Sequence, residues 1–264
     1  MSRIDQTFKR LQGKGQTALI PFIVAGDPDL EATEALVLKL AESGADLIEL
    51  GVPFSDPIAD GTTIQAASQR ALKKGVSIEG ILSLARRLKG ITPPLVLMTY
   101  FNPVFRYGLK HFAAGCKECG VDGVIVPDLP PEEAGPWIKE ARELELDTIF
   151  LVAPTCPPER IRTVNKYSRG FIYYVSITGV TGIRGKLPDN LEQAINGIKE
   201  YTRKPVAVGF GISGPEQAKM ISHYADGVIV GSAIVKIIEK NLNCSNLIDR
   251  VGNFISSLAD ALKS

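Results

Sequence analysis

Two carboxylates stand out in residues 49–61, whose sequence is ELGVPFSDPIADG. Glu49 lies inside an apolar run, where a carboxylate is costly to bury unless it is paired or protonated. Asp60 follows in a segment rich in proline and acid. Two carboxylates in different surroundings can divide the work of a general acid and a general base. The segment therefore indicates proton-transfer chemistry.

The direction of the Glu49 side chain follows from strand alternation, which places Glu49 and Leu50 on opposite faces. If the Leu50 face packs against helices, Glu49 points into the open end of a barrel. Its expected neighbours there are aromatic: Phe22, Tyr100 and Tyr173. Desolvation in such surroundings is expected to raise its pKa toward neutrality. The alternative is a buried acid paired with a structural Lys or Arg, but none ends a predicted strand.

Asp60 is expected to be more solvated than Glu49 and to stay ionised. An ionised carboxylate can hold a substrate N–H group or stabilise a developing cation. The alternative is a turn residue that caps a helix beginning at Thr62 or Thr63. Asp56 and Asp128 are expected to be structural or to face a partner.

Glycine-rich segments follow three consecutive predicted strands, at residues 178–182, 209–213 and 230–233. The last of them opens a short apolar helix over residues 233–239. Glycines let the backbone approach an anion closely, and a helix N-terminus offers unpaired N–H donors. Tight turns alone would also use glycines. Three such ends in succession favour a phosphate site.

Short apolar runs alternate with amphipathic stretches along the chain. The predicted strands are residues 18–24, 46–51, 95–100, 123–127, 148–152, 171–176, 206–210 and 227–230. Predicted helices between them include residues 30–43, 63–73, 78–88, 108–120, 131–145, 190–201 and 214–223, with Asp29 and Ser213 as start signals. Eight such units predict an α/β fold, a (β/α)8 barrel formed by one domain over residues 1–264. A doubly wound sheet is the alternative, although no G-x-G-x-x-G opens the first unit.

Composition excludes several other classes. The chain has 30 Lys+Arg against 29 Asp+Glu, with no basic block, so nucleic acid is not expected as a partner. No apolar stretch is long enough to span a bilayer, and the N-terminus predicts an extra amphipathic helix rather than a signal peptide. Only two His exist, and Cys116 and Cys119 lack a second Cys pair, so we expect no metal site and two ordinary thiols. No Lys ends a strand, which disfavours a Schiff-base aldolase.

Several motifs closely resemble the tryptophan synthase alpha chain family. They are residues 21–28 (PFIVAGDP), 49–61, 127–133 (PDLPPEE), 179–182 (GVTG) and 209–213 (GFGIS). The likeness extends from about Phe8 to Lys240. The segment 49–61 is long and specific, whereas the glycine motifs alone occur in other phosphate-binding barrels.

The resemblance implies a retro-aldol cleavage of indole-3-glycerol phosphate to indole and glyceraldehyde 3-phosphate, without a cofactor on this chain. It implies that Glu49 handles the C3 proton and the glycerol hydroxyl, that Asp60 holds the ring N–H, and that Tyr173 lies beside the reacting groups. Positions that bind phosphate in the family correspond to Gly182, Gly211, Gly231 and Ser232. Positions that line the indole pocket correspond to Phe22, Met98, Tyr100, Ile125 and Leu151, and Thr181 and Phe210 are also expected to contact substrate.

The resemblance also implies a partner, a beta chain that carries pyridoxal phosphate, in an alpha2–beta2 heterotetramer. The expected contacts are loops near Pro53–Asp60, Asn102 and Thr181. By their length, the loops 56–61 and 178–186 are both expected to act as lids. A cytoplasmic protein, or the mature form of a plastid protein, is expected.

Three alternative functions remain open from the sequence. One is a free-standing indole-3-glycerol phosphate lyase that needs no beta chain. Another is an isomerase acting on a phosphorylated sugar attached to an aromatic amine, although such barrels lack the segment 49–61. The third is a catalytically silent activating subunit, against which the intact Glu49 and Asp60 argue.

Overall fold

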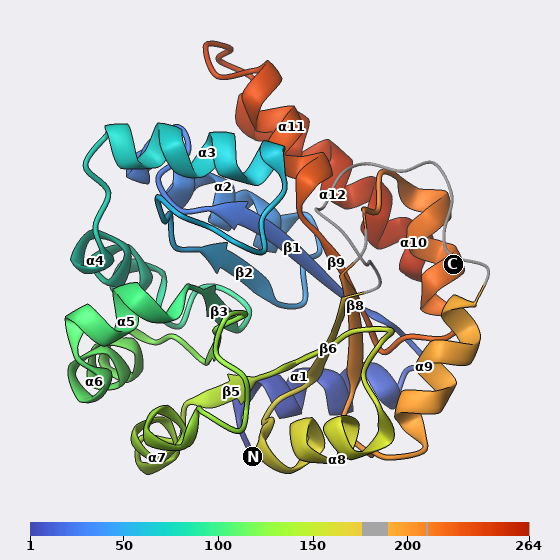
Figure 1. The fold of residues 1–264 in the computed structure, drawn as a ribbon. Helices are drawn as coiled ribbons and strands as arrows, with labels where there is room; N and C mark the ends of the chain where they lie inside the picture. The colour runs from blue at the N-terminus through green and yellow to red at the C-terminus, as the bar shows by residue number, and fades with distance from the viewer. Residues whose placement is uncertain (176–189, 210, 264) are drawn as a thin grey trace.

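The computed structural model of the chain describes residues 1–175, 190–209 and 211–263. Its centre is a sheet of parallel strands surrounded by helices (Figure 1). The strands are β1 Ala18–Val24, β2 Ile48–Gly51, β3 Leu95–Met98, β4 Gly123–Ile125, β5 Asp147–Ile149, β6 Leu151–Val152, β7 Ile172–Val175, β8 Val206–Gly209 and β9 Gly227–Val230.

The order of the strands is β5-β4-β3-β2-β1-β9-β8-β7-β6. The two strands at the ends of this order, β5 and β6, are consecutive in the chain and are separated only by Phe150. The two ends of the sheet therefore meet, and the sheet closes into a barrel. The predicted strand 148–152 is split at Phe150. This confirms the (β/α)8 barrel and makes the doubly wound alternative wrong, because a doubly wound sheet has two separate edges.

The helices occupy the expected places to within a few residues. They are α1 Arg3–Gln12, α2 Leu30–Glu42, α3 Thr62–Lys73, α4 Ile78–Leu88, α5 Phe101–Tyr107, α6 Leu109–Cys119, α7 Gly135–Glu143, α8 Pro158–Tyr167, α9 Leu191–Lys199, α10 Pro215–Ser222, α11 Ser232–Lys240 and α12 Leu247–Lys263. The sequence did not single out α5, α8 or α12.

The two expected start signals have different outcomes. Asp29 caps α2, since its carboxylate accepts the N–H of Ala32 at 2.7 Å. The Ser213 prediction is wrong because Gly214 precedes α10 instead. The Ser213 hydroxyl donates to the side chain of Gln217 at 2.9 Å.

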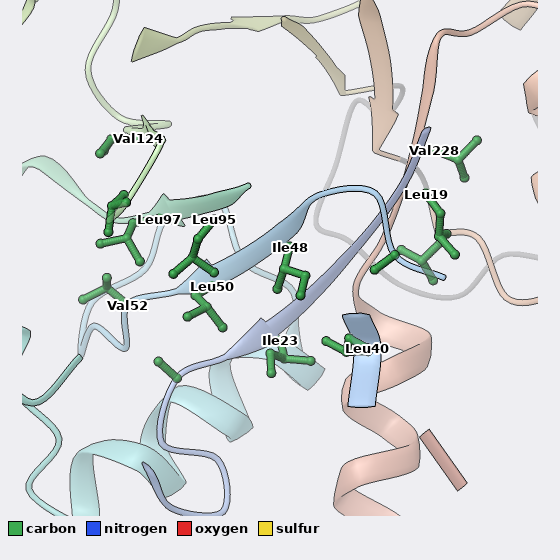
Figure 2. Close-up of a cluster of buried hydrophobic side chains, with 14 of the residues drawn as sticks. Leu19, Ile23, Leu40, Ile48, Leu50, Val52, Leu95, Leu97, Val124 and Val228 are labelled. Carbon is green, nitrogen blue, oxygen red and sulfur yellow. The ribbon is translucent and has the colours of Figure 1, made fainter. Parts of the chain in front are cut away.

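The outer face of the barrel packs against the helices. β1 is buried along its whole length, as expected for a parallel strand covered on both sides. Leu50 belongs to the outer cluster, which confirms the alternation predicted for its strand. Figure 2 shows this cluster, including Leu19, Ile23, Leu40, Ile48, Leu50, Val52, Leu95, Leu97, Val124 and Val228.

A second cluster fills the inside of the barrel and is closed at one end by α1. Its residues on the strands or immediately before them include Ala18, Ile20, Leu47, Val96, Ile125, Ile149, Ala207 and Ile229. Ile4, Phe8 and Leu11 of α1 join this cluster, with the Phe8 ring centroid 5.7 Å from that of Phe171. The extra N-terminal helix predicted from the sequence therefore seals one end of the barrel.

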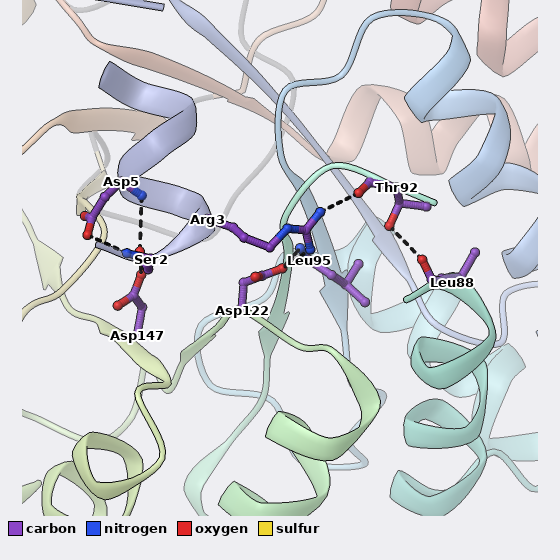
Figure 3. A network of polar contacts seen from close by, with 8 residues as sticks. All are labelled: Ser2, Arg3, Asp5, Leu88, Thr92, Leu95, Asp122 and Asp147. Atoms are coloured by element: carbon purple, nitrogen blue, oxygen red, sulfur yellow. Dashed lines mark hydrogen bonds and ion pairs between the residues drawn. The ribbon is translucent and has the colours of Figure 1, made fainter. Parts of the chain in front are cut away.

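Polar contacts hold α1 in this place (Figure 3). The Ser2 hydroxyl donates to Asp147 at 2.5 Å, and Arg3 donates to Asp122 at 2.9 Å. Asp122 also accepts the N–H of Leu95, the first residue of β3, at 2.9 Å. Because these residues precede or begin their strands, the closed end is the amino-terminal end of the barrel. The carboxyl ends of the strands form the end that is left for a ligand.

Candidate active site

A cavity of about 470 Å³ lies at the carboxyl ends of the strands, a volume that suits a small ligand. Its wall, among the described residues, is formed by Phe22, Glu49, Ile58, Ala59, Asp60, Ile64, Met98, Ile125, Pro127, Leu151, Tyr173, Val175, Gly209, Gly211, Ile212, Ile229, Gly231 and Ser232. No Lys or Arg occurs in this set. An anionic ligand would therefore depend on neutral donors here.

Glu49 lies on β2 with its side chain fully buried in the wall of this cavity. Neither carboxyl oxygen has a hydrogen-bond partner among the described residues, so the paired-acid alternative finds no support there. Burial, and to a smaller extent the charge of Asp60, raises the pKa of Glu49 to about 8. At neutral pH the carboxyl group therefore holds a proton that it can give away and take back.

Asp60 is half-buried at the end of the loop after β2. Burial raises its pKa to about 6, although a hydrogen bond with the Tyr100 side chain acts in the opposite direction. Asp60 is less buried than Glu49, in line with the expectation from the sequence, although the loop folds against the barrel and raises its pKa. Asp60 is nevertheless mostly ionised at pH 7. The capping alternative is wrong, since Gly61 precedes α3 and no side chain caps that helix.

Tyr173 lies on β7 and faces the same cavity. Burial raises its pKa well above the ordinary value, with further contributions from the charges of Glu49 and Asp60. A Cβ on Gly209 of the neighbouring strand β8 would lie 2.5 Å from the Tyr173 hydroxyl. The absence of a side chain at Gly209 therefore makes room for the tyrosine.

Phe22 occupies a similar niche between two glycines. A Cβ on Gly51 of β2 would lie 2.6 Å from its ring, and one on Gly231 after β9 would lie 3.1 Å from it. β2 and β9 are the two neighbours of β1, which carries Phe22. The ring therefore lies over both neighbouring strands and forms an apolar part of the wall.

The N-terminus of α11 opens at the same cavity, through Gly231 and Ser232. No side-chain cap is formed at this terminus, and the first turn contains no acidic residue. Unpaired N–H groups and the helix dipole attract anions at such a position. The expected short helix after the last strand is confirmed, and its first residues face the space that a phosphate would need.

Most of the predicted site residues come together in this cavity. Those on its wall are Phe22, Glu49, Asp60, Met98, Ile125, Leu151, Tyr173, Gly211, Gly231 and Ser232. Tyr100 is not on the wall; it is 4% exposed and bonds to the loop that carries Asp60. Thr181, Gly182, Phe210 and the loop 178–186 lie outside the described residues.

Several wall residues were not predicted from the sequence: Ile58, Ala59, Ile64, Val175, Ile212 and Ile229. Alternation could have found Ile229, which lies on β9 two residues before Gly231 and therefore faces the same side. No pattern distinguishes Ile58, whose side chain is 80% exposed at the edge of the cavity.

Three further observations concern cysteines, metal ligands and membrane spans in the part of the chain that the structure describes. Cys116 and Cys119 are free and buried in α6. Within the described ranges no group of three His, Cys, Asp or Glu side chains could hold a metal ion, and no helix is long and apolar enough to cross a membrane.

Proteins with this fold work at the carboxyl ends of their strands. A protonated carboxyl group that faces an ionised one across an apolar cavity is what acid–base catalysis requires. By fold and site, the chain is a (β/α)8-barrel enzyme. It belongs to the tryptophan synthase alpha chain family, whose sequence profile matches residues 8–263.

Individual relatives agree with this assignment. The chain is 51% identical to the tryptophan synthase alpha chain of Geobacter sulfurreducens over 263 residues, 99% of each chain. It is 48% identical to that of Thermoanaerobacter sp. (strain X514) over 263 residues, 99% of this chain and 100% of the other. Among solved structures, Mycobacterium tuberculosis tryptophan synthase gives a TM-score of 0.92 at 39% identity over 100% of this chain and 99% of that one. Tryptophan synthase subunit alpha from Legionella pneumophila str. Paris also gives 0.92 at 39% identity, over 99% and 98%.

Proposed function

We propose that this chain is a carbon–carbon lyase that cleaves indole-3-glycerol phosphate to indole and glyceraldehyde 3-phosphate, as the alpha subunit of tryptophan synthase in tryptophan biosynthesis. The observation that carries the proposal is Glu49, a fully buried carboxyl group without a described hydrogen-bond partner in an apolar cavity. Membership of the family supports the same activity. The family names do not favour a free-standing lyase.

Glu49 is proposed to act first as an acid and then as a base. With a pKa of about 8 it is mostly protonated at pH 7 and can protonate C3 of the indole ring. The resulting carboxylate then removes the proton of the glycerol hydroxyl next to C3. The bond between C3 and the glycerol carbon breaks, its electron pair returns to the ring, and an aldehyde is released.

Asp60 is proposed to accept the ring N–H, where its negative charge stabilises the cation that C3 protonation creates. Its pKa of about 6 keeps it mostly ionised while Glu49 is mostly protonated. Tyr173 is proposed to align the reacting part of the substrate, because its side chain borders the cavity beside both carboxylates. The two acids thus have separate roles at one pH.

The substrate is proposed to lie across the cavity with its phosphate at Gly211, Gly231 and Ser232, at the N-terminus of α11. The indole ring would contact the apolar part of the wall, which includes Phe22, Met98, Ile125 and Leu151. Substrate contacts at Tyr100, Thr181, Gly182 and Phe210 remain predictions.

The partner is proposed to be a tryptophan synthase beta chain, and pyridoxal phosphate would belong to that chain. An alpha2–beta2 assembly with contacts at Pro53–Asp60, Asn102 and Thr181 is part of the proposal. The exposed side chains of Ile58 and Asn102 support an interface on this side. We also propose that residues 1–264 form a single domain. The proposed location is the cytoplasm, or a plastid after processing.

The direct test is release of indole from indole-3-glycerol phosphate by the purified chain, with and without a beta chain. We expect indole in both cases and much faster release with the partner. Full activity of the isolated chain that a beta chain does not change would favour the free-standing lyase. No indole under either condition would refute the proposed reaction.

Replacing Gly209 with alanine is expected to lower indole release by roughly 10- to 100-fold, because displacing a group in the site by about 1 Å has effects of this size. The new Cβ would lie 2.5 Å from Tyr173 and force that ring to move. Steady-state kinetics measures the loss. The matched control is Gly197→Ala in α9, where an added Cβ meets nothing within 4 Å. Equal activity of the two variants would show that the position of Tyr173 does not matter.

A further inference from the structure

Tyr100 joins the end of β3 to the loop that carries Asp60. Its ring is almost fully buried and stacks on Phe54, with the ring centroids 5.2 Å apart and the planes at 30°. Its hydroxyl accepts the backbone N–H of Ala59 at 3.0 Å. The same hydroxyl interacts with the carboxylate of Asp60 and lowers the pKa of that carboxyl against the larger effect of burial. One side chain thus contacts the loop near its beginning and at its end.

We propose that Tyr100 is a positioning residue that holds the loop 53–60, and with it the Asp60 carboxylate, against the cavity. The inference rests on the role proposed above for Asp60. It differs from the substrate contact expected for Tyr100 from family resemblance, because Tyr100 is not among the residues on the cavity wall.

The hydrogen bond from Ala59 limits what the Tyr100 hydroxyl can do with its own proton. A tyrosine hydroxyl has one proton to donate and lone pairs to accept with. Because the hydroxyl accepts from Ala59, its own proton is available to the neighbouring Asp60, whose carboxylate in the ionised form has only acceptors. This interaction therefore favours the ionised form of Asp60, the form that can receive a substrate N–H. The hydrogen bond from Ala59 also restrains the loop 53–60, in which the side chain of Ile58 is 80% exposed.

The charges around Asp60 come from several elements. Glu49 on β2 and Tyr173 on β7 face it across the cavity, and Asp128 after β4 acts on Tyr100. The named acids carry negative charge when ionised and so oppose ionisation of Asp60. Of these four residues, Tyr100 is the one whose interaction lowers the pKa of the Asp60 carboxyl.

The test compares the wild-type chain with Tyr100→Phe, which removes the hydroxyl and keeps the ring that stacks on Phe54. We expect the pKa of Asp60, followed by carbon NMR of its carboxyl group, to rise by about one unit. The acidic limb of the kcat/KM profile for indole release is expected to move by the same amount, so the loss is roughly tenfold near pH 5 and small near pH 8. Hydrogen exchange of the Ala59 amide is expected to become faster because its acceptor is gone.

The control is Tyr174→Phe, since Tyr174 is equally buried but belongs to the outer cluster away from the cavity. It is expected to leave all three readouts unchanged. Unchanged Asp60 titration and Ala59 exchange in Tyr100→Phe would overturn the proposal. These two readouts need no substrate, so they test Tyr100 even if the wild-type chain releases no indole. That result would count against the proposed function alone.

If Tyr100→Phe does not fold, Phe54→Leu is the second variant. It keeps the Tyr100 hydroxyl and is expected to retain the wild-type pKa of Asp60. A raised pKa of Asp60 in Phe54→Leu would overturn the proposal.

Discussion

Replacing Glu49 with glutamine is expected to leave the chain folded but to lower indole release by a factor of about 10²–10⁴ or more, the usual contribution of a positioned acid–base group. Glutamine has nearly the same shape, so the cavity stays intact. Its amide cannot protonate C3 or take the hydroxyl proton. The loss should appear in kcat more than in KM. The substrate's phosphate and ring are proposed to contact wall residues other than Glu49, and the variant keeps those contacts.

Asp147→Asn is the matched control for this variant. Asp147 is also a buried carboxyl group, and burial raises its pKa to about 6, but it lies at the closed end of the barrel beside Ser2. Its replacement is expected to leave indole release close to that of the wild type. Near-normal turnover in Glu49→Gln, measured in the presence of a beta chain, would refute the catalytic assignment of Glu49.

The same Glu49→Gln substitution is expected to stabilise the folded chain, increasingly so as the pH rises. The pKa of Glu49 lies at about 8 in the folded chain against an ordinary value of 4.5. Between these values the folded state binds more protons than the unfolded state, so the free energy of unfolding falls as the pH rises. Each pKa unit corresponds to about 1.4 kcal/mol, which makes the cost of Glu49 about 3 kcal/mol at pH 7. Glutamine does not titrate and removes this cost.

Urea unfolding of both proteins from pH 4.5 to 9 measures this difference. We expect nearly equal stability at the acidic end, a gain for Glu49→Gln that grows up to about pH 8, and a constant gain above it. A gain that is the same at every pH would have to come from packing rather than from the carboxyl group. No gain at pH 8 would show that Glu49 ionises in the folded chain at little cost.

The proposed acid–base role of Glu49 and its cost to stability have one origin. A carboxyl group without a described hydrogen-bond partner in an apolar cavity is costly to the fold, and the same lack of a partner raises its pKa toward neutrality. The surrounding barrel compensates through two large apolar clusters on the two faces of the sheet. Stability is thus given up at the position where proton transfer is proposed.

The barrel could be predicted from the sequence because its signals are local. Continuous apolar runs mark buried parallel strands, and alternation within one run was enough to direct Glu49 inward and Leu50 outward. The short helix α5 has no such pattern, and the break at Phe150 depends on how the two neighbouring strands close the barrel. Both features are decided by tertiary packing.

The site was predictable only in part for the same reason. Glu49 could be placed from its strand, whereas the surroundings of Asp60 depend on Tyr100, which lies 40 residues further along the chain. Cross-strand neighbours explain the niches of Phe22 and Tyr173, because the glycines that make room for them lie on adjacent strands. A single sequence does not reveal such pairs before the strand order is known.

The most direct test of the account is a crystal structure of the chain with a non-cleavable indole-bearing phosphate. We predict the phosphate at the backbone of Gly211, Gly231 and Ser232, the ring N–H at Asp60 and the C3 side of the ring facing Glu49. A ligand bound with its phosphate away from the N-terminus of α11, or with its ring away from both carboxylates, would contradict the account.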